Sequence, residues 1–474
     1  MREFSSVVGG KRLRESGKIE VRNPFSGKPV GSVAAVNVET AIRSVEDLKV
    51  NRVDLPRYER YAILDKLSRL LEERACEVSR LITDESGLSL RDTKHEVNRA
   101  CEVLRFSAMC SLHDDSQVFP CDVSKRGKQR RIYTMRQPLS LVFAITPFNH
   151  PLNQVVHKIA PAIAAGAKVL LKPSQLAPLA GHYLVELAIE CGLPSEMIGV
   201  LSCTSSEVAE RVLTHPAVEM VTFTGSSRVG RRIASIAGYK RIVLELGGSS
   251  AMLVLKDADV SMAVDLACTG TFMNSGQRCT AIRRILVHES IAGDFVEQLA
   301  NRAREIKFGD PYDPENTMGS VISEKAAIAI QQRVEESIAQ GARLLAGHRR
   351  EGAVYAPTVL DRVTNQMPIV ACETFGPVAP VIRFDTLDEA ISLANDTEFG
   401  LSGAVVSDHW PSIQKVISGL DTGTVNVNEI PGFRLEWSPF GGIKSSGLGY
   451  KEGVLEAIKS MTYLRTYSLP WERP

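Results

Sequence analysis

Apolar positions in the first quarter of the chain recur with helical spacing. Through residues 56–82 they lie three or four positions apart, for example at Leu64 and Leu67. The same spacing runs through residues 88–113, for example at Val97. Because side chains three or four apart share one face of a helix, the pattern predicts two long amphipathic helices.

From Leu139 onward, short apolar runs alternate with helical patterns in two successive blocks. This alternation is typical of a parallel sheet that helices cover on both faces. In the first block we expect strands at 140–146, 168–172, 198–202, 219–223 and 241–246, separated by helices at 153–165, 178–190, 206–214 and 228–236. In the second block we expect strands at 251–255, 283–288, 355–360, 378–383 and 402–406, separated by helices at 258–273, 290–306, 323–340, 387–396 and 410–419.

Residues 117–138 break this regularity. The stretch is basic, with Arg126 and Arg130, and it contains Pro120 and Gly127. Proline and glycine favour turns, so the stretch is predicted to form a projecting hairpin.

Length and composition narrow the class of protein. A chain of 474 residues is too long for one ordinary core, so two or three domains are expected. The net charge of +1 gives no support to nucleic acid or a membrane surface as partner. No uncharged apolar stretch of about 18 residues and no apolar signal core is present, which predicts a cytoplasmic protein. The nine cysteines form no CxxC pair and no metal-ligand spacing with histidine, so no metal site is expected.

One cysteine has a polar setting that suits a nucleophile. Cys279 lies in the run Asn274-Ser-Gly-Gln-Arg-Cys-Thr280, which is unlike a core strand. A thiolate attacks carbonyl carbon, and a neighbouring cation such as Arg278 favours the charged form of a thiol. For a single cysteine the alternative is a buried, inert thiol.

Two polar residues that follow predicted strands suit the remaining steps of an acyl reaction. Glu245 precedes Gly247-Gly248 and could activate water as a general base, although a salt-bridged or helix-capping carboxylate is the alternative. Asn149 could donate to a developing oxyanion together with the backbone N–H of Cys279, unless it only caps the next helix.

Strand ends also carry a weak dinucleotide signal. Gly225 would let the backbone approach a phosphate at a helix N-terminus, and Lys172 could reach a ribose or a phosphate.

Taken together, these runs resemble the aldehyde dehydrogenase superfamily over nearly the whole chain. Seven motifs occur in the order that the family has. They are Thr146-Pro-Phe-Asn149, Leu171-Lys-Pro-Ser174, Phe223-Thr-Gly-Ser226, Glu245-Leu-Gly-Gly248, Gly276-Gln-Arg-Cys279, Glu373-Thr-Phe-Gly-Pro377 and Pro439-Phe-Gly-Gly442.

The resemblance implies roles for individual residues. Cys279 would be the nucleophile that forms a thiohemiacetal and then a thioester, Glu245 the general base and Asn149 the oxyanion donor. NAD or NADP would be the cofactor. Many NAD-preferring members have Glu where Gln175 stands, and that Glu would repel a 2′-phosphate; the choice stays open, with NAD slightly favoured. The implied dinucleotide contacts are Thr146, Pro147, Lys172, Ser174, Gln175, Gly225, Ser226, Gly247, Glu373 and Phe375.

The resemblance also implies an α/β fold with a Rossmann-type dinucleotide-binding domain, an α/β catalytic domain and a small oligomerisation β-sheet. Residues 1–116 and 139–247 would form the dinucleotide-binding domain, and 248–438 the catalytic domain. Residues 117–138 and 456–474 would bridge the subunits of a homodimer or homotetramer.

Several cations predict a small anionic aldehyde as the substrate. Arg278 precedes the nucleophile, His150 follows the oxyanion donor, Arg99 lies on the second long helix, and Arg434 lies in a late loop. Guanidinium groups bind phosphoryl oxygens in bidentate fashion. A single such arginine is usually a solvated surface charge, so the hypothesis depends on their convergence.

These positions, with the tail Gly449-Tyr-Lys-Glu-Gly453 and Trp471, resemble the phosphonoacetaldehyde dehydrogenases within that superfamily. Such enzymes oxidise phosphonoacetaldehyde to phosphonoacetate in the degradation of 2-aminoethylphosphonate. The resemblance implies substrate contacts from Arg99, His150, Arg278, Thr280 and Arg434.

Other functions stay open. A sister enzyme could act on lactaldehyde, glyceraldehyde 3-phosphate, sulfoacetaldehyde or succinic semialdehyde. Members that transfer the acyl group to CoA usually lack the Glu245 match, so its presence speaks against them. A non-catalytic structural relative is the remaining alternative, against which intact Cys279, Glu245 and Asn149 argue.

Overall fold

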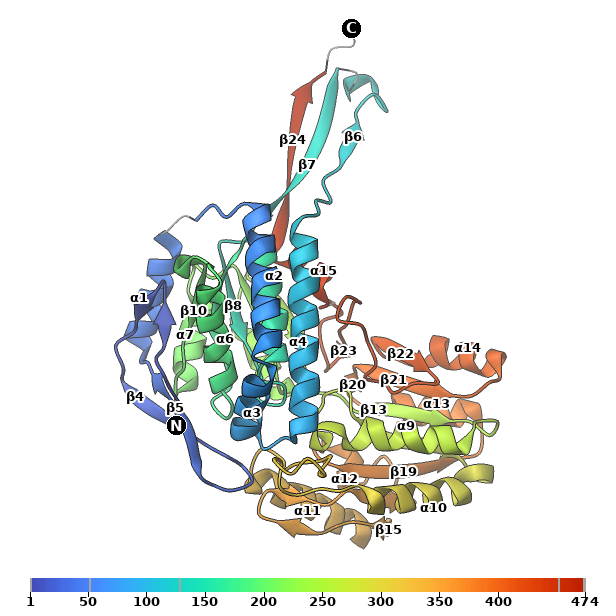
Figure 1. Ribbon diagram of the computed structural model, residues 1–474. Coiled ribbons are helices and arrows are strands. Elements are labelled where there is room, and N and C mark those ends of the chain that lie inside the picture. Colours follow the sequence, from blue (N-terminus) through green and yellow to red (C-terminus); the bar gives the residue numbers. More distant parts are fainter. Residues whose placement is uncertain (1, 51–52, 128, 451, 472–474) are drawn as a thin grey trace.

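Two seven-stranded sheets lie edge to edge, and a third, three-stranded sheet projects from them (Figure 1). The structure, a computed structural model, describes residues 2–50, 53–127, 129–450 and 452–471. Lys451 of the tail motif and residues 472–474 of the expected bridging segment lie outside the described residues.

The first sheet has the strand order β12-β11-β8-β9-β10-β2-β3. From the central β8 the chain steps outward through β9 to β10, then crosses back to β11 and β12 on the other side. Parallel sheets bind ligands at such a reversal, outside the carboxyl ends of the strands. The strands are β2 (Val7–Val8), β3 (Lys11–Arg12), β8 (Leu141–Ile145), β9 (Lys168–Lys172), β10 (Ile198–Val200), β11 (Met220–Thr224) and β12 (Arg241–Glu245).

Helices cover both faces of this sheet, because successive side chains of its strands point to opposite faces. Val142 packs into the core beneath α2, α4 and α5, whereas Phe143 packs into the core beneath α1, α7 and α8. The helices are α1 (Val38–Val50), α2 (Arg57–Glu73), α3 (Ala75–Ser86), α4 (Leu90–Ser111), α5 (Asn153–Ala165), α6 (Leu179–Glu190), α7 (Ser206–Thr214), α8 (Ser227–Ile236) and α15 (Val454–Ser460).

The second sheet has the order β15-β18-β19-β14-β13-β21-β22, and it too is covered on both faces. Its strands are β13 (Ser250–Val254), β14 (Ile282–His288), β15 (Arg343–Ala346), β18 (Thr358–Asp361), β19 (Val378–Phe384), β21 (Ser402–Val406) and β22 (Thr424–Val427). Its helices are α9 (Val260–Phe272), α10 (Glu289–Glu305), α11 (Glu324–Ala339), α12 (Pro368–Ala371), α13 (Leu387–Asn395) and α14 (Trp410–Gly419).

The two sheets meet at opposite ends of their strands: the carboxyl ends in the first sheet face the amino ends in the second. Strand β12 ends at Glu245 and β13 begins at Ser250, so the chain passes directly from the carboxyl edge of one sheet to the amino edge of the next. Segments that precede β14 and β19 in the second sheet therefore face segments that follow β8 and β11 in the first. This junction is where the sequence motifs gather.

The sequence pattern was wrong at two helix and strand boundaries. The expected helix 56–82 is two helices, α2 and α3, which break at Arg74. Both pack on the same core, so the apolar spacing continues across the break and does not reveal it. The expected strand 355–360 begins only at Thr358, after Pro357. Proline lacks the N–H that a strand ladder needs.

Short elements outside the repeating pattern complete the fold. A three-stranded N-terminal sheet combines β1 (Arg2–Phe4), β5 (Pro29–Ala35) and β4 (Gly17–Arg22). The pairs β16 (Arg350–Glu351) with β17 (Val354–Tyr355), and β20 (Phe399–Gly400) with β23 (Ile443–Lys444), and the 3₁₀ turns η1 (Lys125–Gly127), η2 (Ser195–Met197) and η3 (Met273–Gly276) are the remaining pieces.

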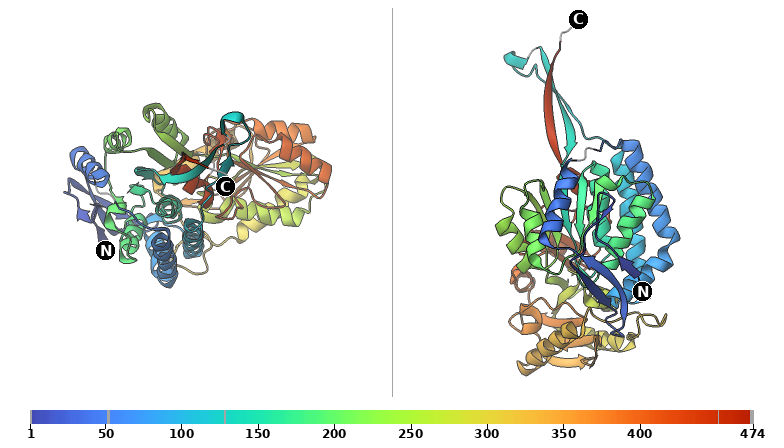
Figure 2. Two further views of the ribbon diagram at one scale, coloured as in Figure 1. Left: turned by 90° about the horizontal axis from the view of Figure 1, so that it is seen from above. Right: turned by 90° about the vertical axis from the view of Figure 1, so that its left-hand side faces the viewer.

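The projecting sheet, here called the arm, joins residues far apart in the sequence. Strands β6 (Val118–Pro120) and β7 (Arg130–Pro138) form the expected hairpin, and β24 (Thr462–Pro470) pairs antiparallel with β7 along its full length. The arm extends away from the rest of the chain in Figure 1 and in the right-hand view of Figure 2. Its side chains include exposed apolar residues such as Leu464 and Tyr467.

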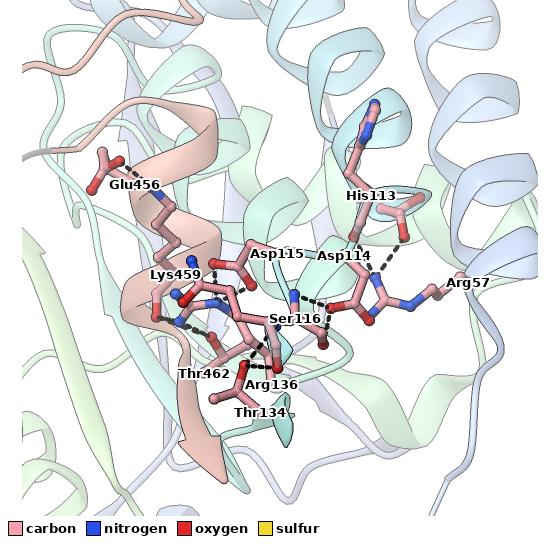
Figure 3. Close-up of polar contacts among 12 residues, drawn as sticks. Arg57, His113, Asp114, Asp115, Ser116, Thr134, Arg136, Glu456, Lys459 and Thr462 are labelled. Carbon is pink, nitrogen blue, oxygen red and sulfur yellow. Dashed lines mark hydrogen bonds and ion pairs between the residues drawn. The ribbon is translucent and has the colours of Figure 1, made fainter. Parts of the chain in front are cut away.

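Arginines hold the base of the arm against the end of α4 (Figure 3). Arg136 Nε donates to both carboxylate oxygens of Asp115, at 2.7 and 2.8 Å, and its Nη1 donates to Thr462 Oγ1 at 3.1 Å. Arg57 Nη2 donates to Asp114 Oδ2 at 2.6 Å. Charge-assisted bonds of this kind hold the end of β7, next to the start of β24.

Replacing Arg136 by Met should loosen the arm without unfolding the sheets. Loss of the charge-assisted bonds, worth about 1.5 kcal/mol, should speed amide hydrogen exchange in residues 130–138 and 462–470 roughly tenfold. Exchange in β8 and β9 should stay as in the parent. Arg302→Met, which removes an exposed ion pair with Asp265, is the matched control. Equal protection of the arm in both variants would contradict this role.

Candidate active site

Cys279 lies on a loop in a left-handed conformation that leads into β14. Asn274, Ser275 and Gly276 have successive φ values of 60°, 52° and 69°. Non-glycine residues adopt this region at a cost of about 1–3 kcal/mol, and such strain persists only where surrounding contacts enforce it. At Gly276 a Cβ would lie 2.2 Å from the Gly376 carbonyl oxygen, so only glycine fits.

A buried arginine supplies those contacts. Arg283, only 3% exposed, donates to the carbonyl oxygens of Gly276, Arg278 and Gly376. The Ile322 N–H donates to Gln277 Oε1 at 2.9 Å, which adds a second contact to the loop. Arg283 was not among the residues predicted from the sequence. A pair of arginines, Arg283-Arg284, inside an otherwise apolar strand is the pattern that could have identified it.

Burial governs the protonation of the thiol. It raises the pKa of Cys279 to about 11, against the opposing effect of Arg434. Arg278, expected from its place in the sequence to favour the thiolate, also lowers the pKa but less than Arg434 does. In the cofactor-free protein the Cys279 thiol is therefore protonated at neutral pH.

The glycines after Glu245 bring three functional groups into one neighbourhood. Glu245 is 5% exposed at the end of β12. At Gly248 a Cβ would lie 2.5 Å from the Cys279 carbonyl oxygen, and at Gly247 it would lie 2.6 Å from Glu373 Oε2. The Gly248 N–H donates to Glu373 Oε1 at 3.2 Å. Side chains at either position would push these segments apart.

Asn149 points at the nucleophile loop. Its Nδ2 donates to the Gln277 carbonyl oxygen at 2.8 Å. The alternative that Asn149 only caps the next helix is wrong, because Glu96 Oε1 accepts the N–H groups of Leu152 and Asn153 at 2.8 and 2.9 Å. An amide nitrogen carries two hydrogens, so Asn149 can serve the loop and a ligand together.

The expected dinucleotide residues line the carboxyl edge of the first sheet. Thr146 and Pro147 follow β8, Gly225 and Ser226 follow β11, and Gly247 follows β12. Lys172 ends β9, and Ser174 and Gln175 follow it. Glu373 and Phe375 reach the same place from the second sheet, where the Phe375 ring lies 6.0 Å from that of Phe148.

This edge suits a dinucleotide. Ser226 caps the N-terminus of α8, a position that favours phosphate. Two buried hydroxyls, Thr146 Oγ1 and Thr224 Oγ1, have no hydrogen-bond partner among the described residues. Gln175 Nε2 donates to the Cys203 carbonyl oxygen at 2.5 Å and brings no negative charge to the ribose position.

Two of the four expected substrate cations share one carboxylate. Arg99 Nε donates to Glu436 Oε1 at 2.5 Å, and Arg434 Nη2 lies 3.8 Å from Glu436 Oε2. His157 Nε2 lies 2.6 Å from Glu436 Oε2. We call Arg99, His157, Arg434 and Glu436 the Glu436 cluster.

The other two cations have different partners. His150 Nδ1 lies 3.8 Å from Glu96 Oε2. Arg278 Nη2 donates to the carbonyl oxygens of Thr269 and Gly270, at 3.0 and 2.9 Å. The Nε of Arg278 is buried without a hydrogen-bond partner in the part of the chain that the structure describes.

Three of these four cations nevertheless act on one further histidine, His95. Burial lowers the pKa of His95, and Arg99, His150 and Arg278 lower it further. Burial also lowers the pKa of Arg278 to about 10, although Asp92 opposes this change. A cavity of about 310 Å³ is lined by His95, Asp92, Thr269 and Met273 among others.

The late loop closes against the nucleophile segment. At Gly432 a Cβ would lie 2.5 Å from Thr280 Oγ1 and 3.6 Å from Arg278 Nη1. The loop that carries Arg434 therefore contacts Thr280.

Sequence analysis missed several polar residues of this region. His95 and Glu96 lie on α4 close to the expected Arg99, and His157 lies on α5. A signal was present in part, because Glu436 stands two residues after Arg434 in the same loop. Among the described ranges, no group of three or more His, Cys, Asp or Glu side chains could hold a metal ion. Within the same ranges, every helix is too short or too polar to cross a membrane.

Known proteins resemble this chain over nearly its full length. A sequence model of the aldehyde dehydrogenase family matches residues 12–467. The 3-sulfolactaldehyde dehydrogenase of Priestia aryabhattai is 35% identical over 465 residues, which are 98% of this chain and 97% of that protein.

Solved structures agree with the sequence match. The NADP-dependent glyceraldehyde-3-phosphate dehydrogenase of Bacillus halodurans C-125, complexed with NADP, has a TM-score of 0.94 at 33% identity and covers 99% of this chain and 100% of that one. Betaine aldehyde dehydrogenase from Staphylococcus aureus, in complex with NAD+, has a TM-score of 0.92 at 29% identity and covers 98% and 94%.

Alkylation of Cys279 in the cofactor-free protein should accelerate about tenfold for each pH unit between pH 7 and 9. The thiolate is the reactive form, and a pKa of about 11 keeps its fraction small throughout this range. The measurement is the iodoacetamide rate at the Cys279 peptide by mass spectrometry, with exposed Cys76 as the reference in the same digest. A rate that levels off below pH 8 would show that the Cys279 thiol is already ionised.

Proposed function

The chain belongs to the aldehyde dehydrogenase family, and we propose that it oxidises phosphonoacetaldehyde to phosphonoacetate with NAD or NADP in phosphonate degradation. The family and the neighbouring structures with NADP and NAD+ establish the coarser statement, an NAD(P)-dependent aldehyde dehydrogenase. What remains to be proposed is the identity of the aldehyde.

The residues of the chain divide the reaction between them. The Cys279 thiol first releases its proton to solvent. The thiolate Sγ then forms a bond to the aldehyde carbon as the carbonyl π pair moves to the oxygen, and Asn149 with the Cys279 N–H donates to this oxyanion. NAD(P), when bound, supplies the acceptor for the hydride. Glu245 then accepts a proton from the water that attacks the thioester, which releases the acid and restores the thiol.

The Glu436 cluster is the observation that carries the substrate assignment. Two guanidinium groups face one buried carboxylate there, so the cluster retains positive charge for an anion. Among the neighbouring cations, Arg434 also lowers the pKa of Cys279 the most. A substrate anion bound at these arginines would therefore lie near the reacting thiol.

A sulfonated aldehyde is the second candidate. The relative from Priestia aryabhattai is named for 3-sulfolactaldehyde. Sulfonate and phosphonate both present three oxygens to guanidinium groups, but phosphonate carries up to two negative charges and sulfonate carries one. Lactaldehyde, glyceraldehyde 3-phosphate and succinic semialdehyde follow as alternatives.

We also propose that the arm joins subunits in a homodimer or homotetramer. Its exposed apolar side chains support this, since such surfaces are commonly covered by a partner. The corresponding division of the chain is a dinucleotide-binding part of 1–116 and 139–247, a catalytic part of 248–438, and bridging segments 117–138 and 456–474.

Phosphonoacetaldehyde should be the preferred substrate by about 100-fold in kcat/KM, which corresponds to about 2.7 kcal/mol of differential transition-state binding. The measurement is absorbance of the reduced nicotinamide, with NAD and with NADP. The comparison substrates are sulfoacetaldehyde, succinic semialdehyde, lactaldehyde and glyceraldehyde 3-phosphate. A flat profile would remove the phosphonate assignment and leave the aldehyde oxidation in place.

Glu245→Gln should separate the two halves of the reaction. Acylation should proceed, while hydrolysis should slow by about 100-fold or more, since general-base catalysis contributes about that much. Stopped-flow absorbance should show a burst of reduced cofactor near one equivalent per Cys279, followed by a slow steady state. Cys279→Ala, which cannot form the acyl enzyme, is the blank. Acylation that slows as far as hydrolysis does would contradict a base role limited to deacylation.

A further inference from the structure

Glu436 is a buried carboxylate with partners from three different elements. It is 3% exposed. Arg99 reaches it from α4, His157 from α5, and Arg434 from its own loop. A carboxylate of this kind is costly to bury unless it is well paired. Its placement therefore needs an explanation beyond filling space.

The charges of the cluster fix its protonation. Burial by itself raises the pKa of Glu436, but His157, Arg434 and Arg99 together hold it well below its ordinary range. An ionised carboxylate only accepts hydrogen bonds, so His157 Nε2–H is the donor in their 2.6 Å contact. Burial lowers the pKa of His157, whereas Glu436 raises it.

The contact with Glu436 orients Arg99. A guanidinium group offers one edge through Nε and another through its two terminal nitrogens. Glu436 Oε1 accepts a hydrogen bond from the Nε of Arg99 at 2.5 Å. Among the described residues, the terminal nitrogens of Arg99 have no hydrogen-bond acceptor, and 22% of its side chain is exposed. The edge that can bind two oxygens of an anion is thus left open.

Arg434 is held from two sides. Its guanidinium carbon lies 4.1 Å from the centre of the Phe440 ring, and Nη2 lies 3.8 Å from Glu436 Oε2. Without the carboxylate, Arg99 and Arg434 would repel each other in a half-buried space. Flexible arginines would relieve that repulsion by turning towards solvent.

We propose that Glu436 is a positioning residue that determines specificity for anionic aldehydes by holding Arg99 and Arg434 in a geometry that binds the substrate anion. The proposal rests on the proposed function in requiring an anionic substrate, but it does not require that the anion be a phosphonate. Glu436 itself does not touch the reacting atoms.

The test is a double-mutant cycle of Glu436→Gln and Arg99→Gln on the full-length enzyme. Glu436→Gln keeps the shape of the side chain and removes its charge. We expect KM for phosphonoacetaldehyde to rise tenfold or more, KM for acetaldehyde to change less than threefold, and kcat for both to fall less than threefold. In the Arg99→Gln background, Glu436→Gln should raise KM by clearly less than the tenfold it causes alone, because only its action through Arg434 remains.

Binding of phosphonoacetate, the expected product, gives a readout without turnover. Its dissociation constant, measured by calorimetry, should rise at least tenfold in Glu436→Gln and partly recover in Glu436→Asp, which restores the charge on a shorter stem. Glu85→Gln is the matched control, since it alters another buried carboxyl that accepts the N–H groups of Leu179 and Ala180. Parallel losses on acetaldehyde and phosphonoacetaldehyde, or unchanged affinity for phosphonoacetate, would overturn the proposal.

The wild-type profile separates this proposal from the substrate assignment. If sulfoacetaldehyde or succinic semialdehyde is the best anionic substrate, the cycle is run with that aldehyde and its product, so the phosphonate assignment fails while Glu436 is still tested. A wild type that prefers acetaldehyde to every anionic aldehyde would overturn both.

Discussion

The position of the nucleophile depends on one buried guanidinium group. Arg283 donates to three carbonyl oxygens and thereby holds a loop whose backbone would otherwise leave the left-handed region. Strain of this kind is stable only where neighbouring groups determine the backbone completely. The same loop carries Cys279 and receives the amide of Asn149, so the geometry of the thiol follows from Arg283.

The surrounding site is built by pairing charges that are removed from water. Lys158, fully buried on α5, donates to Glu452 at 2.8 Å, and Glu436 balances Arg99 and Arg434 nearby. Charge pairs that are largely shielded from water interact strongly and reorient little. A site of this kind suits reactions in which charge develops on an oxygen, because its dipoles and charges are already in place.

The fold itself follows closely from periodicity. Strands such as β9 and β21 end where their apolar runs end, because parallel strands are buried on both faces and carry no other signal. Periodicity failed where two elements share one core, as at the break between α2 and α3. It also gave no sign of the short N-terminal strands β1 and β4, whose few residues are stabilised by pairing with β5.

The sequence by itself determined the chemistry, because a thiol, a carboxylate and an amide beside glycines keep their character wherever they lie. It determined the order of the motifs and hence the family. Only the tertiary structure decided which charges meet. Arg99 and Arg434 are far apart in sequence yet share Glu436, whereas Arg278, adjacent to the thiol, turns one nitrogen to backbone carbonyls. The direction of a long side chain is set by the packing and charges around it, and these come from segments distant in the chain.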